Sequence, residues 1–222
     1  LLISFTPKQS IQTALNFQFQ FMQTHCDFFH WLWCLIFIEI SCHWNLISFF
    51  RFLLINPCFR CVWQYFSFAE GKVVGSGKED ETDNAAWAAR TDWDIAINRY
   101  SIRTNSGEAS STGAKGGVYT FDSTVTFDSV AEVPAGATFS TDKAVTSEGM
   151  GGTTTTVKSE ATVILFKTDA EGNKVMPPVY LQAPVYLFRS ADGNHCYKVL
   201  FTQYQDENKE SGHVIFSFAE VK

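Results

Sequence analysis

No glycine precedes Gly71 in this 222-residue chain, and all 14 glycines lie at or beyond that position. The segment 1–62 also has little charge, because Asp27 and Glu39 are its only acidic residues. Yet it holds five of the six cysteines and 11 of the 21 phenylalanines. Glycine is the residue that tight turns most often require, so this composition is unlike that of a compact soluble domain. We therefore consider residues 1–62 and residues 63–222 separately.

A membrane helix is one interpretation of the first segment, because residues 28–55 are strongly hydrophobic. Ionisable side chains inside a span are costly, however, and this stretch carries His30, Glu39, His43 and Arg51. The segment has neither the basic start nor the small-residue cleavage site of a secretory signal. None of its cysteines has a leucine three positions earlier, as a lipoprotein signal requires. We interpret residues 1–62 as translated upstream sequence or a damaged export signal, with a membrane anchor as the alternative, and assign them no function.

Residues 63–222 have few of the groups that catalysis or zinc binding requires. Their one cysteine is Cys196, and their two histidines are His195 and His213. One cysteine and two histidines are too few for a typical zinc cluster and give little basis for a catalytic cysteine–histidine pair. The glycine-rich stretch STGAKGG lacks the strand–loop–helix setting of a phosphate-binding loop. We therefore expect no enzymatic activity.

The charge of this region restricts its partners. Residues 63–222 contain 14 basic and 21 acidic residues, which gives a formal charge of −7. Nucleic acid needs a basic face, so an acidic domain argues against it as a partner. The acidity argues equally against electrostatic attachment to an anionic membrane. Neutral or apolar ligands, or other proteins, are better candidates.

Short alternating stretches separated by turn residues predict an all-β fold for residues 63–222, a single domain of antiparallel sheets arranged as a sandwich or open barrel. WQYFSFAEGKVV indicates two strands that reverse at Gly71, and DWDIAINRYSIR alternates with a bulge or bend near Asn98. VYTFDSTVTFDSV is another alternating run, and AAWAA is a single helical turn. PVYLFRSADGNHCYKVLFTQYQ is a hairpin that turns at Asp192 and Gly193, and SGHVIFSFAEV is the last strand. We expect a loop from residue 134 to residue 156.

Two methionines stand in unusual surroundings. Met150 lies among glycines in SEGMGGT, and Met176 lies in NKVMPPV. Methionine ordinarily fills irregular gaps in an apolar core, which a stretch of glycines does not provide. An exposed loop residue is the other ordinary interpretation of each.

Three blocks taken together resemble the HmuY-type haem-binding proteins of Bacteroidetes. These are WQYFSFAEGKVV, DWDIAINRYSIRTNSGEASSTGAKGGVY and VYLFRSADGNHCYKVLFTQYQDENKESGHVIFSF. The resemblance implies an all-β fold with haem as cofactor, held between two axial ligands from separate loops. Family members use a histidine pair or a methionine pair. The two corresponding segments here contain no histidine and one methionine each, so the resemblance assigns Met150 and Met176 as the ligands of the haem iron.

Thioether ligation is chemically reasonable at these positions. Methionine sulfur is a neutral, soft axial ligand that raises the reduction potential of haem, and it needs no deprotonation to bind. His195 and His213 are the rival ligands. The aromatic residues able to wall a porphyrin, or else to belong to the core, are Tyr119, Phe121, Tyr180 and Tyr186; Trp93 and Tyr100 are assigned to the core. Arg103 and Lys115 are candidates to pair with a haem propionate.

The resemblance implies a haemophore, a carrier that captures haem and passes it to a TonB-dependent outer-membrane haem receptor, with host haemoproteins as a source. It also implies a lipoprotein-like location on the outer membrane surface, or secretion. The alternative is an exported β-sandwich that binds protein or glycan, as an adhesin does, without haem.

Overall fold

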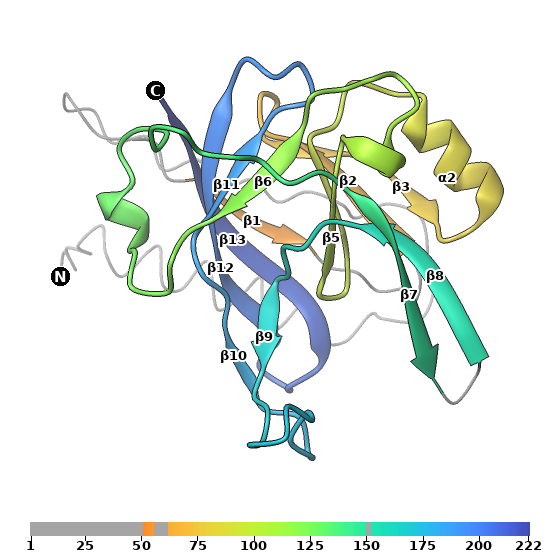
Figure 1. Ribbon diagram of the computed structural model, residues 1–222, viewed down its shortest axis with the longest axis vertical. Helices are drawn as coiled ribbons and strands as arrows, with labels where there is room; N and C mark the ends of the chain where they lie inside the picture. Colours follow the sequence, from red (N-terminus) through yellow and green to blue (C-terminus); the bar gives the residue numbers. More distant parts are fainter. Residues whose placement is uncertain (1–50, 56–61, 150–151) are drawn as a thin grey trace, which may run out of the picture. The chain divides into compact units, whose positions relative to one another are not determined.

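The computed structural model describes residues 51–55, 62–149 and 152–222 (Figure 1). Most of the segment 1–62 therefore lies outside the described residues, and so does Met150. The described part of that segment is strand β1 (Arg51–Ile55), which pairs antiparallel with the last strand, β13 (Ser211–Val221). In the described ranges, no helix is long and apolar enough to cross a membrane.

Two antiparallel sheets build the domain, which confirms the all-β prediction. One sheet has the order β1, β13, β12 (Cys196–Gln205), β11 (Tyr186–Arg189) and β6 (Gly117–Thr120). The other has the order β3 (Lys72–Lys78), β2 (Val62–Ser67), β4 (Ile95–Asn98) and β5 (Ser101–Thr104). Within the part of the chain that the structure describes, the helical elements are α2 (Glu81–Ala88) and the short 3-10 helices η1 (Gly107–Ala109) and η2 (Phe127–Ser129).

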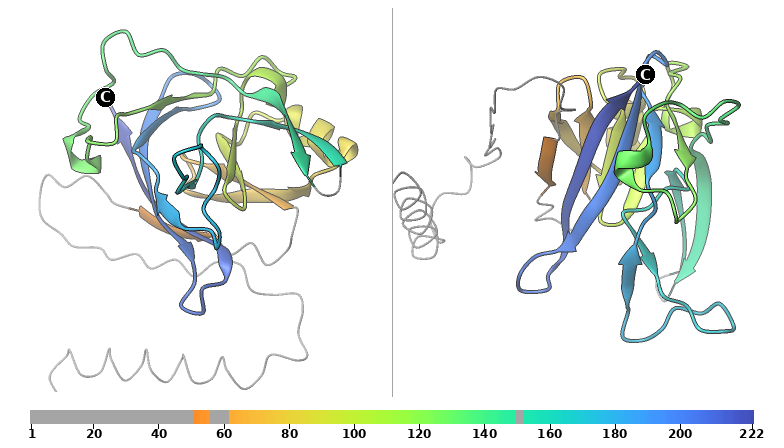
Figure 2. Two further views of the ribbon diagram at one scale, coloured as in Figure 1. Left: turned by 60° about the horizontal axis from the view of Figure 1, so that its bottom comes forward. Right: turned by 90° about the vertical axis from the view of Figure 1, so that its left-hand side faces the viewer.

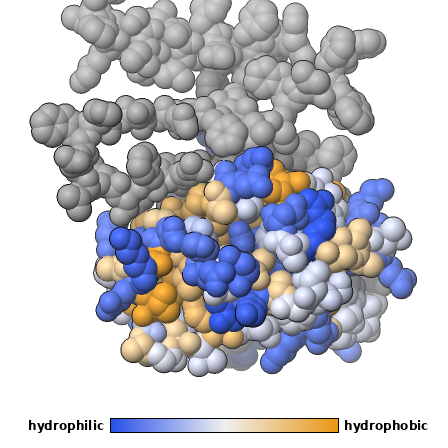
Figure 3. Space-filling model, turned by 90° about the horizontal axis from the view of Figure 1, so that it is seen from above, coloured by the Kyte–Doolittle hydropathy of each residue, from blue (hydrophilic) through white to orange (hydrophobic). Residues whose placement is uncertain are grey.

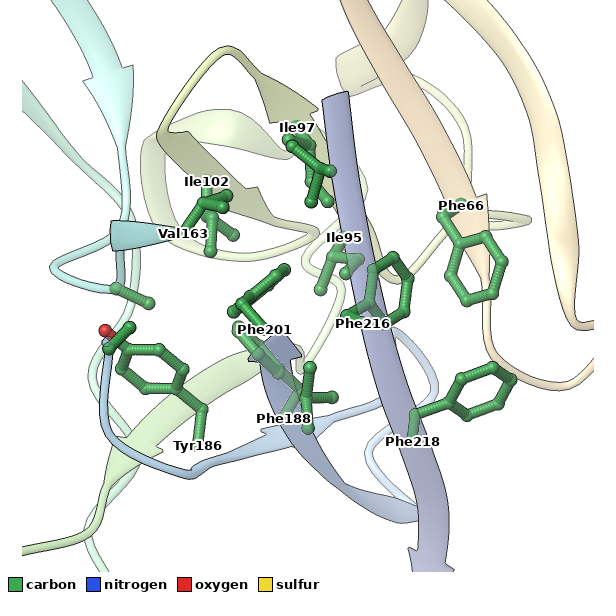
Figure 4. Packing of buried hydrophobic residues seen from close by; sticks show 14 of the residues in the cluster. Phe66, Ile95, Ile97, Ile102, Val163, Tyr186, Phe188, Phe201, Phe216 and Phe218 are labelled. Atoms are coloured by element: carbon green, nitrogen blue, oxygen red, sulfur yellow. The ribbon is translucent and has the colours of Figure 1, made fainter. Parts of the chain in front are cut away.

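The main core combines side chains of both sheets (Figure 4). Ile95 and Ile97 of β4 and Phe66 of β2 meet Phe216 of β13 and Phe201 of β12, and all five are buried. Phe66 and Phe216 pack edge to face, with ring centroids 5.4 Å apart. Because burying large aromatic side chains is a strong driving force, this cluster holds the two sheets together.

A second core covers the other face of the β2–β4 sheet. Tyr65 stacks on Trp87 of α2 with ring centroids 3.8 Å apart, and Trp93 packs against Tyr65 edge to face. Successive side chains of a strand point to opposite faces, so the neighbours Tyr65 and Phe66 of β2 enter different cores. Gly75 and Gly77 of β3 leave the space that the Trp87 ring fills, because a Cβ atom on either would stand 2.6 Å from that ring.

Several local predictions are confirmed. Gly71 turns β2 into β3 with a φ of 63°, and Gly193 turns β11 into β12 with a φ of 80°. The last predicted strand is β13.

Other local predictions are only partly right. The bend near Asn98 is a complete hairpin turn between β4 and β5, with Arg99 at a φ of 56°. In VYTFDSTVTFDSV, the strand ends at Thr120 and η2 follows. The single helical turn is part of an eight-residue helix, which Asp80 caps by accepting a hydrogen bond from the Asp83 backbone N–H.

Two further hairpins project from the same end of the sandwich (Figures 1 and 2). One pairs β7 (Lys143–Gly149) with β8 (Gly152–Lys158), and we call it the first arm. The other pairs β9 (Ile164–Phe166) with β10 (Tyr180–Gln182), and we call it, with its connecting segment 167–179, the second arm. All but the last two residues of the first arm lie inside the range 134–156 for which the sequence predicts a loop, so that prediction is wrong.

Candidate functional site

Exposed apolar side chains gather on the two arms. In residues 62–148 and 152–222, for which the structure describes side-chain exposure, the large hydrophobic side chains that remain exposed are Val145, Leu165, Met176, Val179 and Leu181. Val145 belongs to the first arm and the other four belong to the second. On the visible part of the opposite end, hydrophilic and hydrophobic residues are interspersed (Figure 3). A concentration of exposed apolar groups in one place is typical of a binding site.

The second arm presents a small apolar face. Leu165 and Leu181 are directly opposite each other in the β9–β10 ladder, at 43% and 44% exposure. Their neighbour Ile164 is buried at 7%, because alternate residues of the strand face the core. The two leucines therefore lie side by side on the outer face of the arm.

Met176 lies near the end of the second arm, and its residue is 76% exposed. Backbone hydrogen bonds from Val175 N to Lys167 O and from Lys167 N to Val179 O hold the connecting segment together. Met176 is thus a presented side chain, and the core-filler interpretation is wrong for it. The exposed thioether is available to a ligand.

Met150 belongs to the connection between β7 and β8, outside the described residues. The strands on each side are described, and Gly149 and Gly152 are the last pair of their ladder. Threonines line β8 from Thr153 to Thr156, and most residues of the arm are exposed on both faces. In the sequence, Met150 therefore comes directly after Gly149, the last described residue of β7.

Arg103 anchors the β8 side of the first arm. Its Nε donates to the Val157 carbonyl at 2.7 Å, its Nη1 to Asn84 Oδ1 at 2.7 Å, and its Nη2 to Glu79 Oε1 at 2.7 Å. The guanidinium also lies 3.9 Å from the centre of the Trp63 ring. Because Arg103 is only 4% exposed and is engaged with these groups, it does not fit the expected role of propionate partner.

Asp142 and Glu108 anchor the β7 side of the arm. Asp142 Oδ2 accepts from the Thr104 backbone N–H at 3.0 Å, and Asp142 Oδ1 accepts from Thr104 Oγ1 at 2.5 Å. Glu108 Oε2 accepts from the Ala144 backbone N–H at 3.2 Å. Burial raises the pKa of Asp142 to about 7, although the hydrogen bonds from Thr104 act in the opposite direction. Sequence reasoning gave no indication of this residue.

The aromatic residues proposed as porphyrin walls have different surroundings. Tyr186 is buried in the main core, and its hydroxyl donates to the Thr162 carbonyl at 3.1 Å. Tyr119 and Phe121 pack edge to face in a separate cluster behind β11. Tyr180 is half-buried on the second arm, but it packs against the main core with Tyr204, so it lies on the opposite side of β10 from Leu181.

The rival histidine ligands both lie beside carboxylates. His195 Nδ1 is 2.7 Å from Glu220 Oε1, and His213 Nε2 is 3.8 Å from Asp206 Oδ2. The side chain of Glu220 raises the pKa of His195. Lys115 is exposed, and Gly193 packs against its side chain. Each histidine therefore has a local partner.

A hollow of about 260 Å³ lies between the second arm and β12. Its lining includes Ile164 and Tyr180 on one side and Phe201 and Tyr204 on the other. Gln182 Nε2 donates to the Phe201 carbonyl across it. Tyr180 and Tyr204 also pack edge to face there, with ring centroids 5.2 Å apart, so the second arm is in contact with β12 beside the hollow.

Fold and site geometry together define a β-sandwich domain from which two hairpin arms project at one end. Residues 61–218 match the HmuY protein family, and the chain belongs to that family. No curated protein is similar to it.

Solved structures share the fold. A protein from Bacteroides vulgatus described as HmuY-like and haem-binding is 21% identical with a TM-score of 0.55, over 77% of this chain and 91% of its own. The apo HmuY analogue of Tannerella forsythia is 21% identical with a TM-score of 0.53, over 80% and 98%. A lipoprotein from Bacteroides fragilis is 18% identical with a TM-score of 0.55, over 82% and 94%.

Proposed function

We propose that this chain is a haem-binding carrier that holds haem between its two arms. The observation that carries the proposal is that, within residues 62–148 and 152–222, the exposed large hydrophobic side chains are confined to these arms. A porphyrin is a flat apolar ring, and contact with it would remove Val145, Leu165 and Leu181 from water. Membership of the HmuY family adds independent support.

The residues at the arm ends fit the needs of haem iron. Haem supplies an iron atom whose two axial positions take ligands from opposite sides of the ring. We infer that Met150 and Met176 supply those ligands as neutral sulfur atoms. Met176 is exposed on the second arm, and Gly149 and Gly152 bracket the segment of Met150. Glycine beside a ligand lets the backbone approach the ring closely.

Ligation by two methionines determines the pH and the redox conditions under which the iron is bound. A thioether is not protonated at acidic pH, so its affinity for iron does not fall there. Histidine is protonated at acidic pH, and its affinity for iron falls for this reason. Soft sulfur also favours reduced iron. We therefore expect haem to be retained in acidic surroundings and bound best under reducing conditions.

A carrier function follows from full ligation. With both axial positions taken by the protein, no iron position stays open for catalysis, so we infer that the chain transports haem and is not an enzyme. Its proposed acceptor is a TonB-dependent outer-membrane receptor, and its proposed sources include host haemoproteins. The proposed location is the outer membrane surface, as a lipoprotein, or the outside of the cell.

A haem titration of the full chain tests the proposal. We expect saturable one-to-one binding and a low-spin absorption spectrum that is strongest after reduction. Replacing both ligands, Met150→Ala and Met176→Ala, is expected to abolish this spectrum. Circular dichroism of the variant checks that the fold is intact.

The third methionine of the chain provides the matched control. Met22→Ala removes a thioether outside the family-matched region, and its spectrum is expected to equal that of the parent. If the double variant binds haem with the parent spectrum, the ligand assignment is wrong. If the parent itself does not bind haem, the binding of protein or glycan by the arms becomes the better function.

A further inference from the structure

Three ionisable side chains converge at the turn between β12 and β13, away from the proposed axial ligands. His213 Nε2 lies 3.8 Å from Asp206 Oδ2 and 4.0 Å from Glu210 Oε2. One potential ligand atom of each residue lies within 4.8 Å of the others. Imidazole nitrogen and two carboxylate oxygens form a mixed donor set, which differs from a cluster of acidic groups alone.

The backbone of the turn holds these groups in place. Asp206 Oδ1 accepts from the Glu210 backbone N–H at 2.7 Å, which leaves Oδ2 directed to the histidine. Asp206 N donates to Glu210 O at 3.1 Å, and Lys209 N donates to Asp206 O at 3.0 Å. A carboxylate oriented by a hydrogen bond through its second oxygen resembles metal ligands that an outer contact fixes.

Exposure differs among the three groups in a way that suits cation capture. The side chains of His213 and Asp206 are 22% and 24% exposed, whereas that of Glu210 is 74% exposed. The first two form a partly enclosed pair, and Glu210 is free to rotate and shorten its distance to a shared cation. Bonds of about 2.0–2.2 Å place tetrahedral ligands closer together than these groups now lie, so closure requires this rotation.

We propose that Asp206, Glu210 and His213 form a site for a divalent first-row transition cation of the zinc class. An imidazole ligand favours zinc and its neighbours in the first row over magnesium and calcium, which prefer oxygen. Three protein ligands leave a fourth position for water, as open zinc sites do. The site is separate from the haem ligands, and this inference does not depend on haem binding.

The other histidine of the domain offers a matched comparison. His195 Nδ1 contacts Glu220 Oε1 at 2.7 Å, also near a strand end, but it has no place in a group of three ligands among the described residues. A lone histidine–carboxylate pair supplies two ligands and holds a cation weakly. His195→Gln therefore removes an equivalent side chain without touching the proposed site.

Calorimetric titration of the haem-free full chain with zinc chloride tests the inference. Cysteines and histidines in residues 1–62 are also able to bind zinc, so the decisive quantity is the number of sites lost on substitution. We expect His213→Gln and Asp206→Asn each to remove one binding event or weaken it roughly tenfold or more. His195→Gln is expected to leave the isotherm unchanged, and magnesium chloride is expected to produce no such event.

A further readout separates ligation from folding. Thermal unfolding without zinc shows whether each variant still folds. The inference is overturned if the parent and folded His213→Gln bind the same number of zinc ions with the same affinity. It is also overturned if His195→Gln removes the event instead.

Discussion

The Arg103 Nε atom lies 2.7 Å from the carbonyl oxygen of Val157, and this contact joins the β4–β5 hairpin to the first arm. The same guanidinium reaches Glu79 and Asn84. One buried cation thus ties a projecting strand to the second core. If the first arm supplies an iron ligand, its direction depends on this contact.

Removing the guanidinium should destabilise the whole domain. Arg103→Ala leaves Glu79 with a missing partner and a buried carbonyl without its donor, and we expect a loss of about 3 kcal/mol in the free energy of unfolding. Chemical denaturation measures this loss.

Arg90 is the matched control for Arg103. It also lies over a tryptophan, at 4.1 Å from the Trp87 ring, and it also pairs with a carboxylate, that of Asp92. Its side chain is 42% exposed, whereas that of Arg103 is 5% exposed. Arg90→Ala should therefore cost about 1 kcal/mol or less. Equal losses in the two variants would contradict the anchoring role of Arg103.

Asp142 should make stability depend on pH near neutrality. Its folded pKa of about 7 lies above the ordinary value of 3.8, so the folded protein binds the proton more tightly than the unfolded chain does. The contribution of this group is complete below pH 4 and is lost as the pH rises through 7. Its size is on the order of a few kcal/mol. Unfolding free energies measured between pH 4.5 and 8 report the slope.

Asparagine at position 142 reproduces the protonated carboxyl without titrating. Its amide group can donate to Thr104 Oγ1 while its oxygen accepts from the Thr104 backbone N–H. Asp142→Asn should therefore be more stable than the parent at pH 8 and should lose part of the pH slope. An unchanged slope would show that another group is responsible.

Replacing Gly77 even by alanine should destabilise the domain. A Cβ atom there would lie 2.6 Å from the Trp87 Nε1 atom, in a strand where the backbone itself does not require glycine. We expect Gly77→Ala to cost about 1–3 kcal/mol in unfolding free energy. Trp87→Leu removes the ring, so the methyl group added by Gly77→Ala should then cost less unfolding free energy. The losses in the double variant should therefore be smaller than the sum of the two single losses. Additive losses would mean that the glycine and the ring do not compete for space.

The apolar face of the second arm should matter for ligand binding more than for folding. Replacing Leu165 and Leu181 together by serine removes exposed side chains, so the melting temperature should change little. Haem affinity should fall roughly tenfold or more, because the apolar contact area is lost. Ile164→Ser, at the buried neighbour, should instead lower the melting temperature. If the leucine variant binds haem as tightly as the parent, the arm face is not the contact surface.

Alternation and turn residues predict the sandwich well, because its strands have one face in a core. Ile95 and Ile97 face the main core while Ala96 between them faces the second core, and Gly71 and Gly193 supply the positive φ values of the turns. The first arm is different. It buries neither face, so its threonine run shows no alternation of apolar and polar residues, and the sequence indicates a loop.

Only part of the candidate site can be predicted from the sequence. The family resemblance assigns Met176 as an iron ligand, which stays a prediction, and the structure shows that Met176 is exposed. The anchoring roles of Arg103 and Asp142 cannot be predicted, because Arg103 contacts Val157 and Asp142 contacts Thr104 across long stretches of chain. Such contacts have no local pattern. Tyr186 shows the converse, since a strand aromatic facing a ligand and one facing the core have the same sequence signal.

A crystal structure of the full chain with bound haem tests the central claim most directly. The account predicts one haem between the two arms, with the sulfur atoms of Met150 and Met176 bound to the iron from opposite faces. Haem ligated by His195 or His213, or haem seated away from the arms, would contradict it.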